Sequence, residues 1–151
     1  MVNQARILSR AKWRVRACAG LLLVLLPATL PASTRMAEAR RHYEAQRYEQ
    51  VLEVLGARIS RGSDQGMDSP RLLLIGKAYG RLAEAAPWYR AVRLAVHCRE
   101  YLERAVAADP DNADAVQALA RFLEQAPALV GGDAERAMTL RKQLENRQRS
   151  S

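Results

Sequence analysis

The stretch REYLERAVAADPDNADAVQALARFLEQAPALVGGDAERA, residues 99–137, decides the fold of this chain. Its apolar residues recur every three or four positions, which is the spacing of one buried helix face. The turn DPDN at 109–112 interrupts this periodicity, and Asn112 is a favourable N-cap for the helix that follows. Pro127 ends that helix because proline lacks a backbone N–H. The stretch therefore predicts a helix, a tight turn, a second helix, and a loop before a third.

The spacing of small and apolar residues on either side of the DPDN turn defines two half-patterns. The first contains Cys98-x3-Leu102 and closes at Pro110. The second lies in the following helix, at Val116, Leu119, Ala120 and Leu123. The two correspond to the end, A-x3-F then P, and the beginning, W-x2-L-G-x2-Y, of a tetratricopeptide repeat of ~34 residues. The stretch thus resembles the junction of two such repeats, and the resemblance implies antiparallel helix pairs.

A further copy of the first half-pattern lies upstream, in Leu72-x2-Ile75-Gly76-x2-Tyr79. Glycine inside a helix costs ~1 kcal/mol relative to alanine. Gly76 therefore predicts that a neighbouring helix approaches too closely for a side chain. Ser69 and Pro70 precede this segment, and we expect the Ser69 oxygen to cap its first free backbone N–H groups.

An insertion separates this half-pattern from its continuation at Cys98, which comes about ten residues later than a repeat of ordinary length allows. Either the first helix runs on to Ala86 and the chain turns at Pro87, or the second helix begins early near Trp88. Both alternatives place Trp88 and Tyr89 at a helix junction. There they either pack the turn against the core or form an exposed aromatic anchor, because aromatic residues dominate binding hot spots.

A narrower resemblance rests on the pattern AxxAPWYRxxxLAxHCREYLERAVAADPDNADAVQALARFLEQAPALVGGDAERA, residues 83–137. It resembles a group of small exported bacterial tetratricopeptide-repeat proteins with an aromatic-containing insertion, a helix ending in DPDN, and an A-P-x-x-x-G-G loop. The resemblance extends over residues 69–144. It implies an all-α, right-handed array of about three antiparallel helix pairs, but it does not identify a ligand. The first pair, residues 35–60, lacks a Leu-Gly pair before Tyr43 and a closing proline, so it is degenerate.

The N-terminal 33 residues have the composition of a secretory signal peptide. Five basic and no acidic side chains accompany the apolar run 17–30, which is shorter than the roughly 20 residues of a membrane span. We expect cleavage near Ala32 or Ser33, and the alternative is a leader retained as a membrane anchor. Removing it takes five of 24 basic and none of 16 acidic residues, so the net charge falls from +8 to +3. The high isoelectric point is therefore poor evidence for nucleic-acid binding.

Beyond the leader the sequence predicts four segments. The degenerate pair occupies 34–62, with helices at 35–46 and 48–60 and with Ile59 facing inward. A linker loop covers 63–69, and two repeat-like pairs with the insertion near 83–90 cover 70–146. These include helices at 113–125 and 134–146, the last capped by Asp133. Residues 147–151 are expected to be disordered.

In a repeat of this kind the first helix of each pair lines a concave groove. The positions carried over from the repeat are Arg40, Tyr43, Glu44, Leu73, Lys77, Arg81, Gln117, Arg121 and Glu124. Lys77, Arg81 and Arg121 would make one end of the groove basic, which suits an acidic peptide or a terminal carboxylate. The alternative is that these side chains only form a solvated surface.

Catalytic and metal-binding patterns do not fit this chain. His97 and Cys98 are adjacent in a helix and point in different directions, and Cys98 falls on a small, buried repeat position. The DPDN turn has no glycine at the sixth place of a calcium loop, and Ala120 stands where the closing glutamate belongs. No lysine and serine or threonine follow Gly131-Gly132 as in a phosphate loop. We therefore expect no enzyme activity, no cofactor and no metal.

Two classes of function remain open. The first is a periplasmic adaptor that binds another protein or peptide, an acidic one included, through the groove or through the aromatic insertion. The second is a membrane-tethered or self-assembling structural subunit of an envelope or solute-transport complex, with Trp88 and Tyr89 near the bilayer. Homo-oligomerisation and membrane contact are compatible with either, whereas nucleic-acid binding is not expected.

Overall fold

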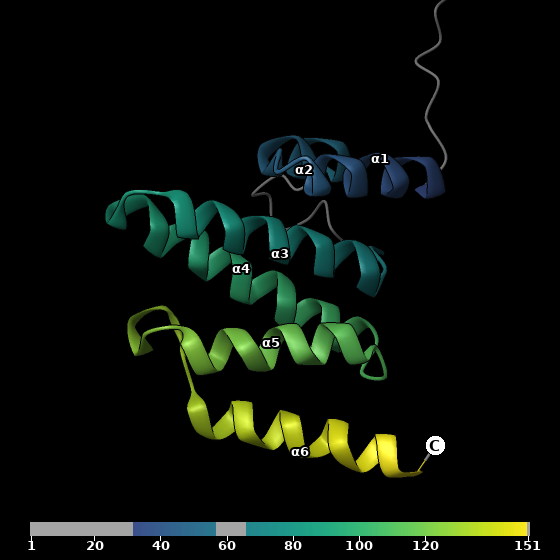
Figure 1. Cartoon of the computed structure of the whole chain (residues 1–151), viewed down its shortest axis with the longest axis vertical. Coiled ribbons are helices and arrows are strands. Elements are labelled where there is room, and N and C mark those ends of the chain that lie inside the picture. Colours follow the sequence, from purple (N-terminus) through teal and green to yellow (C-terminus); the bar gives the residue numbers. More distant parts are fainter. Residues whose placement is uncertain (1–31, 57–65, 151) are drawn as a thin grey trace, which may run out of the picture.

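A computed structural model describes residues 32–56 and 66–150, and these residues form an all-α fold (Figure 1). No β-strand occurs within the two described ranges. The elements are α1 (Ala32–Glu44), α2 (Tyr48–Leu55), α3 (Ser69–Ala85), α4 (Trp88–Ala108), α5 (Ala113–Gln125), the short 3-10 helix η1 (Ala128–Val130) and α6 (Ala134–Ser150). The expectation of an all-α fold is confirmed.

The helices stack in the order in which they occur along the chain. Each packs against its neighbours in sequence, and α3 also contacts both α1 and α5. From α3 to α6, successive helices run in opposite directions, and α4 lies behind α3 and α5 (Figure 1). Because α3 contacts both α1 and α5, these three helices lie on one side of the stack with α3 in the middle.

The core runs through this stack as a single cluster. Its largest fully buried side chains are Val51, Leu55, Ile75, Leu119 and Leu123. They come from α2, α3 and α5, where the apolar positions recur at helical spacing. Marginal helices of this length gain stability mainly from such tertiary packing.

Gly76 marks a close approach between α3 and α4. A methyl group on this residue would lie 2.9 Å from Cδ2 and 3.3 Å from the backbone nitrogen of Leu102. Gly80, one turn later, faces the Cys98 sulfur in the same way, at 3.3 Å. The predicted close contact of a neighbouring helix at Gly76 is confirmed.

Asn112 joins two layers of the stack through one side chain. Its Oδ1 accepts a hydrogen bond from the backbone N–H of Ala115, at 3.2 Å, which confirms it as the N-cap of α5. Its Nδ2 donates to the Oγ of Ser69 at 2.8 Å. The prediction that Ser69 caps α3 is wrong. Ser69 is already helical, Asp68 precedes it, and the buried hydroxyl accepts from Asn112 instead.

Two predicted helix ends differ from the structure. α2 ends at Leu55 rather than at residue 60, because Gly56 adopts a left-handed conformation with φ of 69° that terminates the helix. α6 continues to Ser150, past the predicted end at residue 146, so residues 147–150 are helical rather than disordered. Arg147 donates a hydrogen bond of 2.5 Å to the Pro110 carbonyl, which ties this last turn to the loop before α5.

The insertion lengthens two helices rather than forming a loop. α3 runs to Ala85, and α4 begins at Trp88 after Pro87, so both alternatives for the extra residues hold together. The backbone nitrogen of Ala91 bonds to the Pro87 carbonyl at 2.9 Å, which starts α4 immediately after the proline. The α3–α4 turn therefore projects beyond the rest of the stack at the left of Figure 1.

Several predictions concern residues outside the described ranges. They are the leader up to residue 31, the inward orientation of Ile59, and residues 63–65 of the predicted linker. Within the described part of the chain, no helix combines the length and apolar character needed to cross a bilayer.

Candidate functional site

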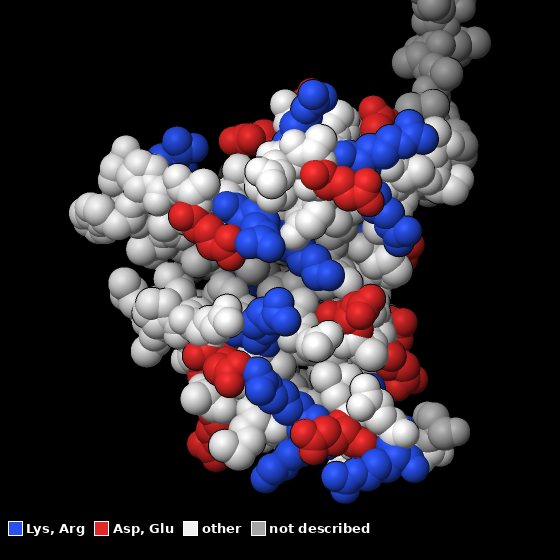
Figure 2. Space-filling view, in the orientation of Figure 1, with Lys and Arg blue, Asp and Glu red and all other residues white. Residues whose placement is uncertain are grey.

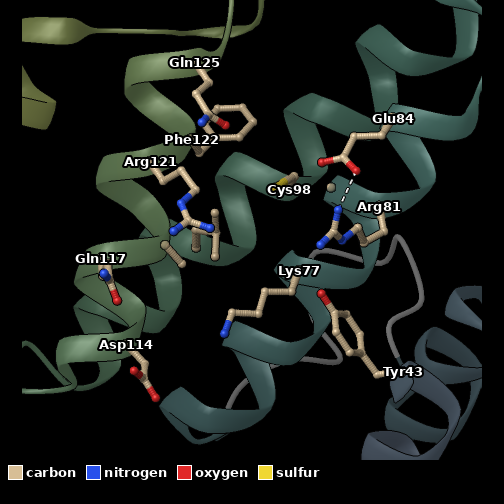
Figure 3. A pocket seen from close by; sticks show the side chains of 13 residues that line it. Tyr43, Lys77, Arg81, Glu84, Cys98, Asp114, Gln117, Arg121, Phe122 and Gln125 are labelled. Atoms are coloured by element: carbon tan, nitrogen blue, oxygen red, sulfur yellow. Dashed lines mark hydrogen bonds and ion pairs between the residues drawn. The ribbon is translucent and has the colours of Figure 1, made fainter. Parts of the chain in front are cut away.

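A groove of about 490 Å³ lies between α3 and α5, with α4 beneath it and the end of α1 at one side (Figure 3). Most of its lining is polar. Its side chains come from all four helices: Tyr43, Lys77, Arg81, Glu84, Cys98, Leu102, Asp114, Gln117, Ala118, Arg121, Phe122 and Gln125, together with the backbone at Gly80. The groove is thus built by segments far apart in the sequence.

The structure brings five of the nine predicted groove residues together. These are Tyr43, Lys77, Arg81, Gln117 and Arg121. They share the groove because residues three or four apart on one helix lie on the same face.

The other four predicted residues lie elsewhere. Leu73 is 8 % exposed and belongs to the core, so it is not a groove residue. Arg40 and Glu44 are exposed on α1 without lining the groove. Glu124 accepts a hydrogen bond from Arg141 of α6 and lies outside the lining. Leu73 was placed wrongly because the repeat pattern does not show that α3 is buried on several sides.

Sequence reasoning missed three polar groups of the groove: Glu84, Asp114 and Gln125. Asp114 is three residues before Gln117, and Gln125 is four residues after Arg121. Helical periodicity therefore puts each on the same face as a residue that was predicted. Extending the predicted face by one turn in each direction would have found them.

Three basic and two acidic side chains line the groove, but they are not equally available. Arg81 donates a hydrogen bond to Glu84 at 2.9 Å, and this carboxylate, with a smaller contribution from the Tyr43 hydroxyl, raises the pKa of Arg81. Within the described residues, no ion pair or hydrogen bond engages the side chains of Lys77 or Arg121. Both point into the groove in Figure 3, so they provide its unpaired positive charge.

Positive charge also continues beyond the groove, along the centre of the face shown in Figure 2. In Figure 2, Lys and Arg side chains run across the stack from the α1 layer to the α6 layer, with Asp and Glu interspersed. Paired charges such as Arg141–Glu124 and Arg136–Glu103 account for part of this surface. Exposed pairs of this kind contribute little to stability.

Cys98 lies at the floor of the groove but is 4 % exposed. Burial raises the pKa of its thiol from 9.0 to about 12, and the Glu84 carboxylate adds to the rise. Because the thiolate is the reactive form of cysteine, this thiol is a core group rather than a nucleophile. That agrees with the small, buried position expected from the repeat pattern.

We expect Cys98 to resist thiol reagents at pH 8 in the folded chain and to react rapidly in denaturant. A Cys18→Ser variant makes Cys98 the single thiol. Since the pKa is raised on folding, the stabilisation from the protonated thiol is complete below about pH 9 and is lost as the pH rises toward 12. Across this pH range, the free energy of unfolding should decline more steeply than it does in a Cys98→Ala chain. Fast native labelling at pH 8 would contradict the burial.

Trp88 and Tyr89 do not pack the α3–α4 turn against the core. Trp88 is 81 % exposed and Tyr89 63 % exposed, and their rings meet edge to face with centroids 6.1 Å apart. The interpretation that they fasten the turn to the core is therefore wrong. Their exposure fits the alternative of an aromatic anchor, and neither lines the groove.

The two histidines of the chain lie on different helices, α1 and α4. No group of three His, Cys, Asp or Glu side chains in the described part of the chain is arranged to hold a metal ion. His97 lies 3.4 Å from Glu100 in an exposed contact and packs against Tyr79, with ring centroids 5.3 Å apart. His42 is on α1, far from His97 in sequence and paired loosely with Glu38.

Comparison of the chain with protein-family models, with curated proteins and with solved structures gives no match.

Proposed function

We propose that this chain is a non-catalytic adaptor that binds an acidic segment of another protein in the groove between α3 and α5. The observation that carries the proposal is that Lys77 and Arg121 point into one groove without an ion partner among the described residues. Two cations on adjacent helices form charge-assisted hydrogen bonds with a carboxylate side chain or a terminal carboxylate. Gln117, one turn before Arg121 on α5, adds a neutral hydrogen-bonding group.

The helix arrangement supports a scaffold of the tetratricopeptide type. α1, α3 and α5 are the first helices of three successive pairs, α3 contacts both of the others, and all three contribute to the groove. A repeat array offers such an extended concave surface for binding. In this proposal the structure belongs with small exported bacterial tetratricopeptide-repeat proteins, and the adaptor acts in the periplasm after export.

The last helix favours a discrete adaptor over an open-ended assembly. Along α6 only Ala137 is buried, with Leu140 partly packed against the core. The outward side chains of this helix are mostly charged or polar. A polar outer face is the usual feature of a helix that caps a repeat array, so further copies are not expected to stack on this end.

The direct test is binding by the full chain from an envelope extract, compared with a Lys77→Glu, Arg121→Glu variant. We expect a specific partner whose affinity falls at least roughly tenfold in the variant, since each charge-assisted contact is worth about 1.5 to 3 kcal/mol. The matched control is Arg40→Glu, Arg41→Glu, which reverses two exposed charges on α1 outside the groove. Equal loss in both variants, or retention in both, would contradict groove binding.

A further inference from the structure

The α3–α4 turn is a second surface with its own chemistry, separate from the groove. Its two exposed rings, Trp88 and Tyr89, project together from the first turn of α4. Arg90 and Arg93 are exposed on the same helix, and Arg93 lies one turn beyond Tyr89. The surface therefore combines amphipathic aromatic rings with guanidinium groups.

No acidic residue lies near these arginines along the chain. Residues 85–99 contain three arginines and neither aspartate nor glutamate, and the first turn of α4 has no acidic side chain. The nearest upstream carboxylate, Glu84, is bonded to Arg81. The turn thus carries a net positive charge beside its aromatic rings.

The neighbouring loop adds apolar surface at the same edge. The segment between α5 and α6 contains Leu129, which is 81 % exposed, and residues 126–132 carry no charge. In Figure 1 this loop and the α3–α4 turn both lie at the left edge of the molecule. Figure 2 shows that this edge is mostly uncharged, with few basic or acidic side chains.

We propose that this edge docks on an anionic phospholipid surface, with Trp88 and Tyr89 in the headgroup layer and Arg90 and Arg93 against lipid phosphates. Trp and Tyr prefer the boundary between water and hydrocarbon because one part of each ring is apolar and another is polar. Exposed arginines gain from the negative potential of anionic lipids.

The shape of the edge favours a membrane over a protein partner. A stable protein interface buries about 800 Å² on each side, whereas the two rings form the tip of one projecting turn. A tip of this kind enters a soft lipid interface without a complementary pocket. The docking leaves the groove open, because the residues of the turn do not line it.

The test uses the full chain with Trp13→Phe, which leaves Trp88 as the single tryptophan. Because an apolar run such as residues 17–30 is expected to bind lipid by itself, the readout is the environment of Trp88 rather than cosedimentation. With vesicles containing about a third phosphatidylglycerol, we expect the emission to shift to shorter wavelength and brominated lipids to quench it. Vesicles of phosphatidylcholine alone should require at least roughly tenfold more lipid for the same shift.

Charge variants separate docking through the turn from attachment through the leader. Arg90→Glu, Arg93→Glu in the Trp13→Phe chain should abolish the lipid preference of the Trp88 signal, whereas Arg40→Glu, Arg41→Glu should retain it. Helical circular dichroism checks that each variant is folded. Trp88 emission that stays unchanged with anionic vesicles, as it would if a protein were the natural partner, overturns the proposal. An equal shift in Arg90→Glu, Arg93→Glu overturns it too.

Discussion

Replacing Gly132 with alanine should lower the free energy of unfolding by about 2 to 3 kcal/mol, the cost of forcing an extra group into a packed site. A methyl group at this position would lie 1.8 Å from the carbonyl oxygen of Ala126 and 2.7 Å from its carbon. The obstacle is backbone, so a rotamer change cannot relieve it. The N–H of Gly132 also donates a hydrogen bond to the Pro127 carbonyl at 3.0 Å, which joins the beginning and the end of the loop.

Gly56→Ala is the matched control for this substitution. Gly56 has a φ of 69° but nothing within 4 Å of an added methyl group, so its replacement costs only the left-handed backbone strain, roughly 1 kcal/mol. Urea unfolding of full-length Gly132→Ala and Gly56→Ala compares the free-energy cost of a steric clash with the cost of a strained backbone conformation. An effect of Gly132→Ala no larger than that of Gly56→Ala would show that the α5–α6 loop is not closed as described.

Replacing Ile75 with alanine should have the largest effect on the core, about 2 to 5 kcal/mol. Ile75 is fully buried in α3, the helix that contacts α1, α2, α4 and α5, so its removal leaves a cavity where the layers meet. Domains of this size are typically stable by 5 to 15 kcal/mol, roughly. The substitution therefore removes a large part of the total, and thermal unfolding followed by circular dichroism measures it.

Leu129→Ala serves as the comparison, because Leu129 is 81 % exposed in the α5–α6 loop. A surface substitution of this kind changes stability by at most about 0.5 kcal/mol. Similar melting temperatures for Ile75→Ala and Leu129→Ala would mean that the layers do not share one core around α3.

Periodicity and turn chemistry were sufficient to predict the helices but not all of their ends. Asn112, Pro127 and Asp133 act through the backbone next to them, so their roles at helix ends were readable from sequence. The end of α2 depends on the left-handed conformation of Gly56, which competes with an apolar pattern that continues to Ile59.

Tertiary contacts explain the predictions that failed. Ser69 looks like an N-cap locally, but Asn112, 43 positions away in sequence, takes its hydroxyl as an acceptor. Residues 147–150 look unstructured in isolation, yet Arg147 lies against the Pro110 carbonyl. Trp88 and Tyr89 are large and apolar, which suggested burial, but lengthening both α3 and α4 carries the turn beyond the core. None of these outcomes follows from a short window of sequence.

The part of the candidate site that could be predicted from the sequence was the set of helix faces that line the groove. The face containing Lys77 and Arg81 and the face containing Gln117 and Arg121 followed from the repeat pattern, and the structure places them around one groove. The repeat pattern did not show which of the groove cations is available to a ligand. That depends on the ion pair between Arg81 and Glu84, whose charged atoms lie 2.9 Å apart. Lys77 and Arg121 consequently carry the proposed function.

The central claim, that a partner occupies the groove, is tested most directly by photo-crosslinking from position 117 in living cells. A photoreactive residue replaces Gln117, which lines the groove, and in a parallel chain it replaces Gln50, which is exposed on α2 outside it. We predict a discrete adduct from position 117 that disappears with Lys77→Glu, Arg121→Glu and has no counterpart from position 50. Identical adducts from both positions, or an adduct at position 117 that survives the charge reversal, would contradict the account.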